Sequence, residues 1–147
     1  MEKDFNQDIE RLLEMPYWVI DFLPMQVPEG GGGQFFAVEQ YYMKEPQYDR
    51  LCRQFGDVML RLSCYYDMLV SIDGGDEWLF PDPGMLEKWL ASSLRHGNFY
   101  ALIKDEDALI TASSGDTNMT LYNPSPALLD LARQLANAAG LFLWRPE

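Results

Sequence analysis

The chain has few cations, one histidine, two cysteines and no apolar run long enough to cross a bilayer. Eleven Lys and Arg stand against 23 Asp and Glu in 147 residues, which gives a formal net charge of −12 at pH 7. Such a chain repels nucleic-acid phosphates and anionic lipid headgroups. We therefore expect no direct nucleic-acid binding and no membrane binding, whereas a basic partner would be attracted over long range.

The scarcity of histidine and cysteine narrows the possible chemistry. A single histidine, His96, excludes multi-histidine metal sites, so we predict neither a metal nor any other cofactor. Cys52 and Cys64 are twelve residues apart in one predicted helix, a rise of about 18 Å that a disulfide cannot bridge. We expect both to be buried thiols in a reducing compartment. The acidic N-terminus lacks the features of a signal peptide, which also favours a cytoplasmic protein.

What the chain does have is apolar and aromatic material for a core. Hydrophobic residues make up 48% and aromatic residues 14%, values that are typical of a globular protein rather than a disordered one. No internal repeat or linker divides the chain, so residues 1–147 are predicted to form a single domain. The predicted element order is αββαβαβββα. We expect an α+β domain with an antiparallel or mixed sheet of five or six strands and three or four helices packed mainly on one face.

The first half of the chain predicts a helix, two strands and a long helix. Asp4 caps a helix that ends before Pro16, and residues 17–27 form a strand rich in aromatic and β-branched side chains. After a glycine-rich loop, residues 34–43 form a second strand. Because both of its faces are largely apolar, we expect this strand at the centre of the sheet. A long helix follows over residues 46–66.

The second half predicts short strands and capped helices. Asp82 and Ser125 are N-cap residues, each followed by a proline in the first helical turn. An acidic turn joins the two strands of a β-hairpin, and a third strand extends this meander. The predicted segments are strand 68–72, helix 82–97, strands 99–104, 108–112 and 118–122, helix 125–140 and an apolar ending at 141–144.

The glycine-rich string at residues 74–78, GGDEW, resembles the GGDEF signature of diguanylate cyclases. In that family a glycine-rich hairpin turn meets the substrate, and a carboxylate helps to hold a catalytic metal. The likeness covers about ten residues and then ends. The family's first strand carries a metal-binding Asp followed by a Phe-Lys and an Asn-Asp pair, whereas Asp21-Phe22 is followed here by Leu23-Pro24. The favoured interpretation of residues 74–78 is therefore a tight acidic turn.

Two loops carry polar residues from which a ligand site can be built. The candidate ligand-binding residues are Asp73, Asp76, Glu77 and Trp78 in the first loop and Ser114, Asp116 and Thr117 in the second. Their oxygen atoms suit a hard cation or a small polar molecule. The spacing of an EF-hand is absent, and the same residue types are common in ordinary turns. No set of base, nucleophile and oxyanion donor can be assembled, so no catalytic residue is predicted.

Aromatic residues occur in adjacent pairs at positions 35–36, 41–42 and 65–66. In a strand, such a pair places one ring on each face of the sheet. A face that no helix covers would then present aromatic rings, which are enriched at protein interfaces. We therefore assign Phe35, Tyr41 and Tyr65 as candidate interaction residues.

The sequence DTNMTLYNPS at residues 116–125 and the closing GLFLW at residues 140–144 resemble small acidic proteins of anaerobic Gram-positive bacteria. The likeness covers the last quarter of the chain, and residues 16–43 more loosely. Those proteins form an uncharacterised family without an assigned activity. The resemblance therefore implies a bacterial origin and nothing about chemistry.

Together these features favour a non-catalytic protein-interaction module over an enzyme. The favoured function is to bind, or to inhibit, a basic protein partner in the cytoplasm through carboxylates and aromatic rings. The alternative is a small-molecule-binding protein or a modest enzyme that uses the loops at residues 73–78 and 113–118. A third interpretation is a homo-oligomer whose exposed aromatic sheet face is its own interface.

Overall fold

The computed structural model describes residues 5–25, 32–114 and 117–146. Within these residues the chain forms five α-helices, one short 3₁₀ helix and six β-strands. The elements in chain order are α1 (Phe5–Leu12), β1 (Tyr17–Asp21), α2 (Gly32–Tyr42), α3 (Gln47–Leu62), β2 (Leu69–Ser71), α4 (Pro83–His96), β3 (Asn98–Ile103), η1 (Lys104–Glu106), β4 (Ala108–Ser113), β5 (Asn118–Tyr122), α5 (Pro126–Ala138) and β6 (Phe142–Trp144).

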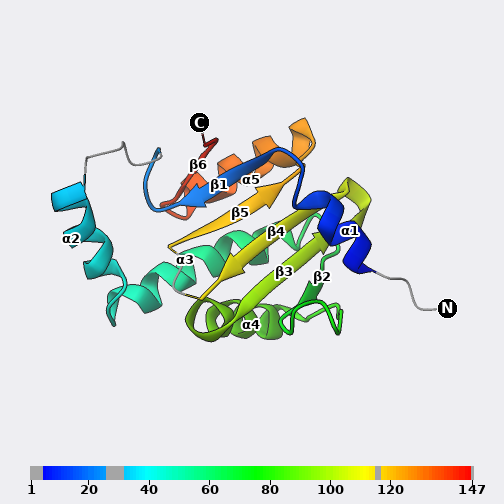
Figure 1. Ribbon diagram of the computed structural model, residues 1–147, viewed down its shortest axis with the longest axis horizontal. Coiled ribbons are helices and arrows are strands. Elements are labelled where there is room, and N and C mark those ends of the chain that lie inside the picture. The colour runs from blue at the N-terminus through cyan, green and yellow to red at the C-terminus, as the bar shows by residue number, and fades with distance from the viewer. Residues whose placement is uncertain (1–4, 26–31, 115–116, 147) are drawn as a thin grey trace.

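All six strands belong to one antiparallel sheet with the order β2-β3-β4-β5-β1-β6 (Figure 1). Strands β3, β4 and β5 form the predicted meander, in which Ala101 of β3 lies opposite Ile110 of β4. Strand β1 joins this meander from the N-terminal part of the chain, with Ile20 opposite Met119 of β5. The prediction of an α+β domain with an antiparallel sheet is therefore confirmed.

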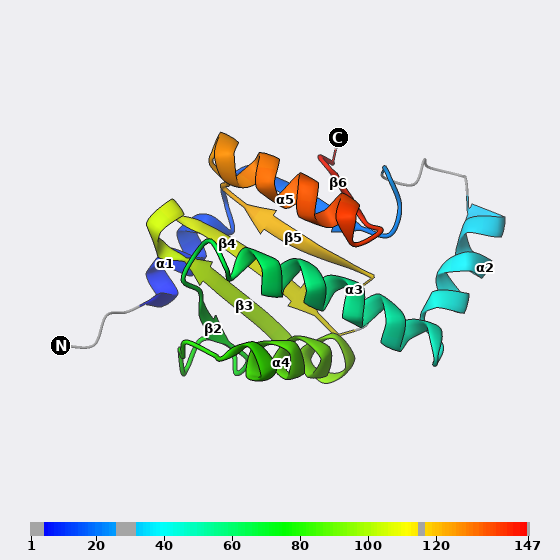
Figure 2. The same cartoon turned by 180° about the vertical axis from the view of Figure 1, so that it is seen from behind.

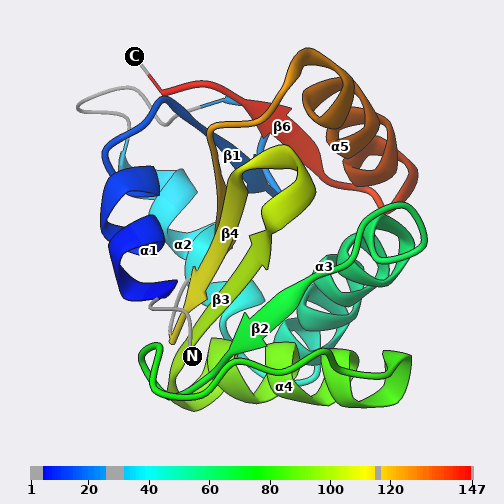
Figure 3. The same ribbon diagram turned by 90° about the vertical axis from the view of Figure 1, so that its right-hand side faces the viewer.

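The helices cover the two faces of the sheet unequally. Helices α3, α4 and α5 lie together on one face (Figure 2), where Phe55 and Phe99 are fully buried in the larger core cluster. Helix α1 packs on the opposite face (Figure 3), where Ile9 and Leu12 contact a smaller cluster that contains Leu109. Most of the helical mass is on one face, as the sequence predicts.

The predicted N-caps explain where two of these helices begin. The Asp82 carboxylate accepts a hydrogen bond of 2.9 Å from the Met85 N–H at the start of α4. The Ser125 hydroxyl accepts one of 3.1 Å from the Leu128 N–H at the start of α5. In both helices a proline follows the cap, at a position where its missing N–H costs no intrahelical hydrogen bond. These two helices are therefore determined largely by local sequence.

The prediction of a central strand at residues 34–43 is wrong, because this segment forms helix α2. Four of its apolar residues, Phe35, Phe36, Ala37 and Val38, are consecutive, so they distinguish poorly between a period of two and a period of 3.6. The sheet also offers no central place for it beside β1. Both edges of β1 are occupied, by β5 on one side and by β6 on the other. In Figure 1, α2 lies at one end of the molecule, outside the sheet.

Three further expectations need correction. The apolar ending forms a true strand, β6, which pairs with β1 so that Trp144 lies opposite Val19. The element order is therefore αβααβαβββαβ. Strand β1 ends at Asp21, well before the predicted residue 27, and α3 ends at Leu62 rather than 66. The structure also has more helices than the predicted three or four. The edge strand was missed because a three-residue strand gives too short a pattern to detect.

The two cysteines are free thiols, but only one of them is buried. Cys52 lies on the core side of α3, as predicted, and burial raises the pKa of its thiol. Cys64 follows the end of α3 and is exposed, which corrects the expectation of two buried thiols. Among the described residues, no helix combines the length and the apolar composition that a membrane-crossing segment requires.

Candidate functional site

The glycine-rich segment after β2 is a tight turn that folds the chain back along the outer edge of the sheet. Val70 and Leu79 exchange two backbone hydrogen bonds, of 2.8 and 3.0 Å. Residues 70–80 therefore form an irregular hairpin, with Phe80 placed beside Leu69 of β2. Residues 74–78 thus form the tight acidic turn that the sequence favoured over a diguanylate cyclase signature.

Asp73 and Trp78 stabilise this turn from within. The Ser71 hydroxyl donates to Asp73 at 2.8 Å and accepts from the Gly75 N–H at 2.9 Å. The Glu77 N–H donates to the same Asp73 oxygen, and the Trp78 indole N–H donates to the Gly75 carbonyl. The Glu77 N–H and the Ser71 hydroxyl hold the pKa of Asp73 below its ordinary value. Asp73 and Trp78 therefore shape the loop, whereas Asp76 and Glu77 are exposed.

Phe80 is the most exposed aromatic side chain near the sheet, with 68% of its surface accessible. It stands between two hollows of about 150 and 200 Å³ at the β2 edge. The first hollow is lined by Leu69 and Leu102, which face the α1 side of the sheet. The second is lined by Met68 and Leu86, which face the α3–α4 side. We name Phe80 with its flanking residues Tyr66, Asp67, Pro81 and Asp105 the Phe80 surface.

Carboxylates border the Phe80 surface. Asp67 lines both hollows and Asp105 lines the first, and both side chains are exposed. Burial raises the pKa of the Tyr66 phenol, and the neighbouring Glu106 carboxylate acts in the same direction. Lys104 is the one cation among the described residues that line the two hollows. The surface thus combines an exposed apolar ring with an acidic rim.

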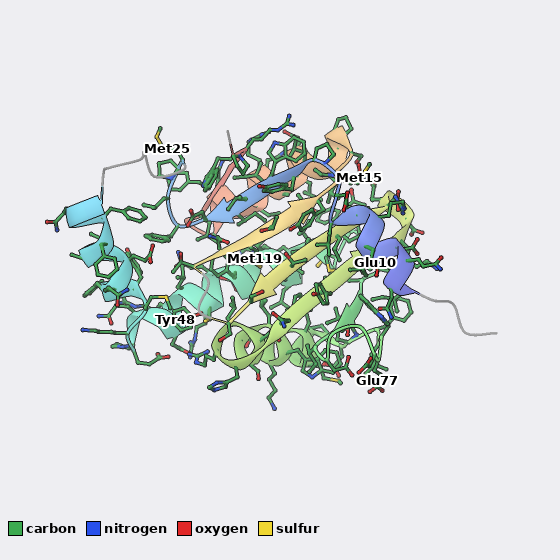
Figure 4. The ribbon with its side chains drawn as sticks, viewed as in Figure 1. Glu10, Met15, Met25, Tyr48, Glu77 and Met119 are labelled. Carbon is green, nitrogen blue, oxygen red and sulfur yellow. The ribbon has the colours of Figure 1, made fainter. Side chains whose placement is uncertain are left out.

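The acidic turn extends the same edge of the molecule. Phe80 follows Glu77 by three positions, which is roughly 10 Å along an extended chain. Figure 4 shows Glu77 and Glu10 of α1 toward the same end of the molecule, far from α2. The end of the molecule that carries the hairpin therefore also carries the carboxylates of Glu10 and Glu77 (Figure 4).

The two predicted ligand-binding loops emerge from the same end of the sheet, but they do so from different strands. Ser71 at the end of β2 and Thr111 near the end of β4 both pair with Tyr100 of β3, which places them two strands apart, roughly 10 Å. Ser114 is used structurally, because its hydroxyl donates to the Arg95 carbonyl at 3.0 Å. Thr117 is half-buried, and Asp116 lies outside the described residues. A ligand site across both loops stays a prediction.

The three predicted interaction residues lie on two different elements. Phe35 is half-buried and Tyr41 is 53% exposed, and both belong to α2. Tyr65 is 64% exposed and follows the end of α3, next to Tyr66 of the Phe80 surface. Because residues 35 and 41 are helical, the aromatic sheet face that we expected to mediate self-association does not form. Homo-oligomerisation stays a prediction, but it no longer has an exposed aromatic sheet face to support it.

Asp21 is a polar side chain that the sequence gave no reason to single out. It is only 6% exposed, on the sheet face opposite to α3–α5, and it accepts a 2.7 Å hydrogen bond from the Phe22 N–H. Burial raises its pKa to about 6, and Glu39 of α2 contributes in the same direction. The Trp144 indole N–H lowers that pKa somewhat, although its geometry falls short of a hydrogen bond and it has no other partner in the described part of the chain.

The candidate site is therefore an exposed surface and not a buried reaction centre. Within residues 5–25, 32–114 and 117–146, no three His, Cys, Asp or Glu side chains converge on a position where they could hold a metal ion. Comparison with family models, with curated protein sequences and with solved structures gave no match. The function is accordingly argued from the geometry and the charge of the surface.

Proposed function

We propose that this chain is a non-catalytic protein-interaction module that binds a basic partner through the Phe80 surface. The observation that carries the proposal is Phe80 itself, 68% exposed between two small hollows and bordered by Asp67 and Asp105. An aromatic ring in that position gains about 2 kcal/mol when a partner removes it from water. Aromatic anchors next to pockets, surrounded by polar groups, are typical of binding hot spots.

The size of the two hollows favours protein side chains over a small molecule as their occupants. Their volumes, about 150 and 200 Å³, are below the range of roughly 300–1,000 Å³ that ligand pockets usually have. Each hollow opens beside Phe80, so two apolar side chains of one partner segment can pack against opposite sides of the ring. The partner segment should therefore carry two apolar residues close together.

The acidic rim determines the charge of that partner. Asp67, Asp105, Asp76 and Glu77 lie along one edge of a chain with a net charge of −12. Rim charges of this kind accelerate association with a partner of opposite charge and exclude partners of like charge.

The free thiols of Cys52 and Cys64 support a reducing, cytoplasmic setting for the encounter.

Selection from a random peptide library displayed on phage tests the proposal without a known partner. We expect the selected peptides to carry Lys or Arg next to one or two large apolar residues. Their affinity should fall by about tenfold between low salt and physiological salt, because exposed charges are screened. Selected peptides that are acidic or neutral, or whose binding ignores salt, would contradict the proposal.

Matched variants locate the binding surface. Phe80→Ser should abolish binding of the selected peptides, since it removes the apolar anchor and leaves the fold intact at an exposed position. The pair Asp67→Asn and Asp105→Asn should weaken binding, whereas Asp57→Asn and Asp130→Asn, equally exposed but on α3 and α5, should not. Equal effects of the two pairs would mean that only the net charge matters, and the Phe80 surface would then be rejected. Circular dichroism confirms that each variant is folded.

A further inference from the structure

A groove between α2 and the start of α3 differs from the rest of this acidic molecule. Its volume is about 440 Å³, more than twice that of either hollow beside Phe80 and within the range of small-molecule sites. The groove lies at the α2 end of the molecule, where Figure 4 labels Tyr48 of α3, whereas Glu77 lies at the other end. Its lining consists of Tyr41, Tyr42, Gln47, Arg50, Arg53 and Gln54.

Two tyrosine rings form an aromatic corner in this groove. The rings of Tyr41 and Tyr42 are 5.7 Å apart and nearly perpendicular, with an interplanar angle of 86°. Tyr42 is held in place by Phe22, whose ring centre is 4.9 Å from its own. Tyr41 is 53% exposed, so part of its ring is accessible to a ligand.

The groove also concentrates positive charge and hydrogen-bond donors. Arg50 and Arg53 lie one helical turn apart on α3, and both are exposed. Arg53 pairs with Asp49 at 3.0 Å, whereas Arg50 has no carboxylate partner among the described residues. Gln54 is fixed by a 3.0 Å hydrogen bond from its side-chain nitrogen to the Ala139 carbonyl. An unpaired guanidinium beside exposed aromatic rings is suited to an anion with a planar body.

We infer that the groove is a binding site for a small anion with a flat, apolar ring system, that is, an aromatic carboxylate or phosphate. Arg50 binds the anionic group and Tyr41 stacks on the ring system. The site is separate from the Phe80 surface, and the two have opposite local charge. The net charge of −12 does not prevent binding at physiological ionic strength, where charges more than about 8 Å away are screened.

Anilinonaphthalene sulfonate, a flat aromatic anion whose fluorescence rises in apolar sites, serves as the probe. We expect the folded protein to bind it, and Arg50→Gln to weaken this binding by about tenfold, as loss of a charge-assisted hydrogen bond does. The control is Arg61→Gln, which makes the same charge change at an exposed position on the same helix, about 16 Å further along. This control should bind the probe as the wild type does. Equal affinities of the two variants would overturn the inference.

Two further measurements test the two halves of the proposed ligand. The neutral analogue phenyl-naphthylamine should bind the wild type more weakly than the sulfonate does. Its affinity for Arg50→Gln should equal its affinity for the wild type. Displacement of the probe by naphthoate would assign a carboxylate ligand, and displacement by adenosine monophosphate a phosphate ligand. Displacement by neither would overturn the inference. None of these results depends on the Phe80 surface, so this inference and the proposed function fail separately.

Discussion

At the scale of single residues, Asp21 shows how folding changes the chemistry of a common side chain. Its position at the end of β1 buries the carboxylate beside Phe22 and near Glu39 of α2. Desolvation disfavours the charged form more than the Phe22 N–H stabilises it, so the pKa rises to about 6. The folded protein therefore binds a proton in a pH range in which the unfolded chain has released it.

This linkage predicts the effect of replacing Asp21. The pKa in the folded state is above the ordinary value of 3.8, so wild-type stability falls as the pH rises from about 4 to about 6. Asp21→Asn cannot titrate and should be more stable than the wild type by up to about 3 kcal/mol at pH 7. The difference should shrink toward zero at pH 4. Urea unfolding at several pH values measures it.

Asp57→Asn is the control for this prediction. Asp57 lies on α3 and is exposed, so its replacement should change stability by little at either pH. A pH dependence of the Asp21→Asn effect no larger than that of the control would show that burial does not perturb this carboxylate.

At the scale of secondary-structure elements, α5 and α2 represent two different origins of helical structure. Helix α5 has a cap at Ser125, a proline at its first position and one buried stripe that includes Leu128 and Ala132. Helix α2 has apolar side chains around most of its circumference, and Phe36 is 61% exposed. A helix with this composition is normally buried. Helix α5 thus has a local cap and a buried stripe, whereas none of the described side chains of α2 is fully buried.

The cap of α5 yields the prediction at this scale. Ser125→Ala removes the acceptor for the Leu128 N–H and should lower the free energy of unfolding by about 1 kcal/mol. Ser125→Thr keeps a hydroxyl at the same position and should recover most of this loss. Chemical denaturation of the three proteins measures both effects. An unchanged midpoint for Ser125→Ala would mean that water or another group satisfies the first turn equally well.

At the scale of the whole molecule, charge is distributed unevenly over two ends. The end with α1, the hairpin and the Phe80 surface is acidic, whereas Arg50 and Arg53 lie beside α2. A few exposed ion pairs offset the net charge, such as Arg11 with Asp107 at 2.6 Å and Arg95 with Glu45 at 2.8 Å. Exposed pairs contribute little to stability, so repulsion among the excess carboxylates should dominate.

Salt should therefore stabilise this protein. Raising the ionic strength from about 0.01 to 0.15 M shortens the screening length from about 30 to 8 Å and weakens repulsion among the carboxylates. We expect the thermal midpoint to rise by about 2 to 5 °C. Differential scanning calorimetry measures this shift. A midpoint that falls with salt would show that the ion pairs of Arg11 and Arg95 outweigh the repulsion.

The parts of the fold that were predicted correctly are those whose information is local. The caps at Asp82 and Ser125, the β3–β4–β5 meander and the acidic turn near Asp76 depend on residues a few positions apart. The candidate site was predicted less well. Tyr65 was identified next to the Phe80 surface, but Phe80 was missed, because an aromatic residue before a proline gives no sign of being exposed.

The sequence alone thus determined the fold class, the strong acidity and the helices that have caps. Only the tertiary structure decided that residues 34–42 are helical, that β6 completes the sheet, that Asp21 is buried and that Arg50 and Tyr41 line one groove. The physical reason is the range of the interactions. Capping and turn formation involve neighbours along the chain, whereas strand pairing, burial and groove formation depend on partners that only folding brings together.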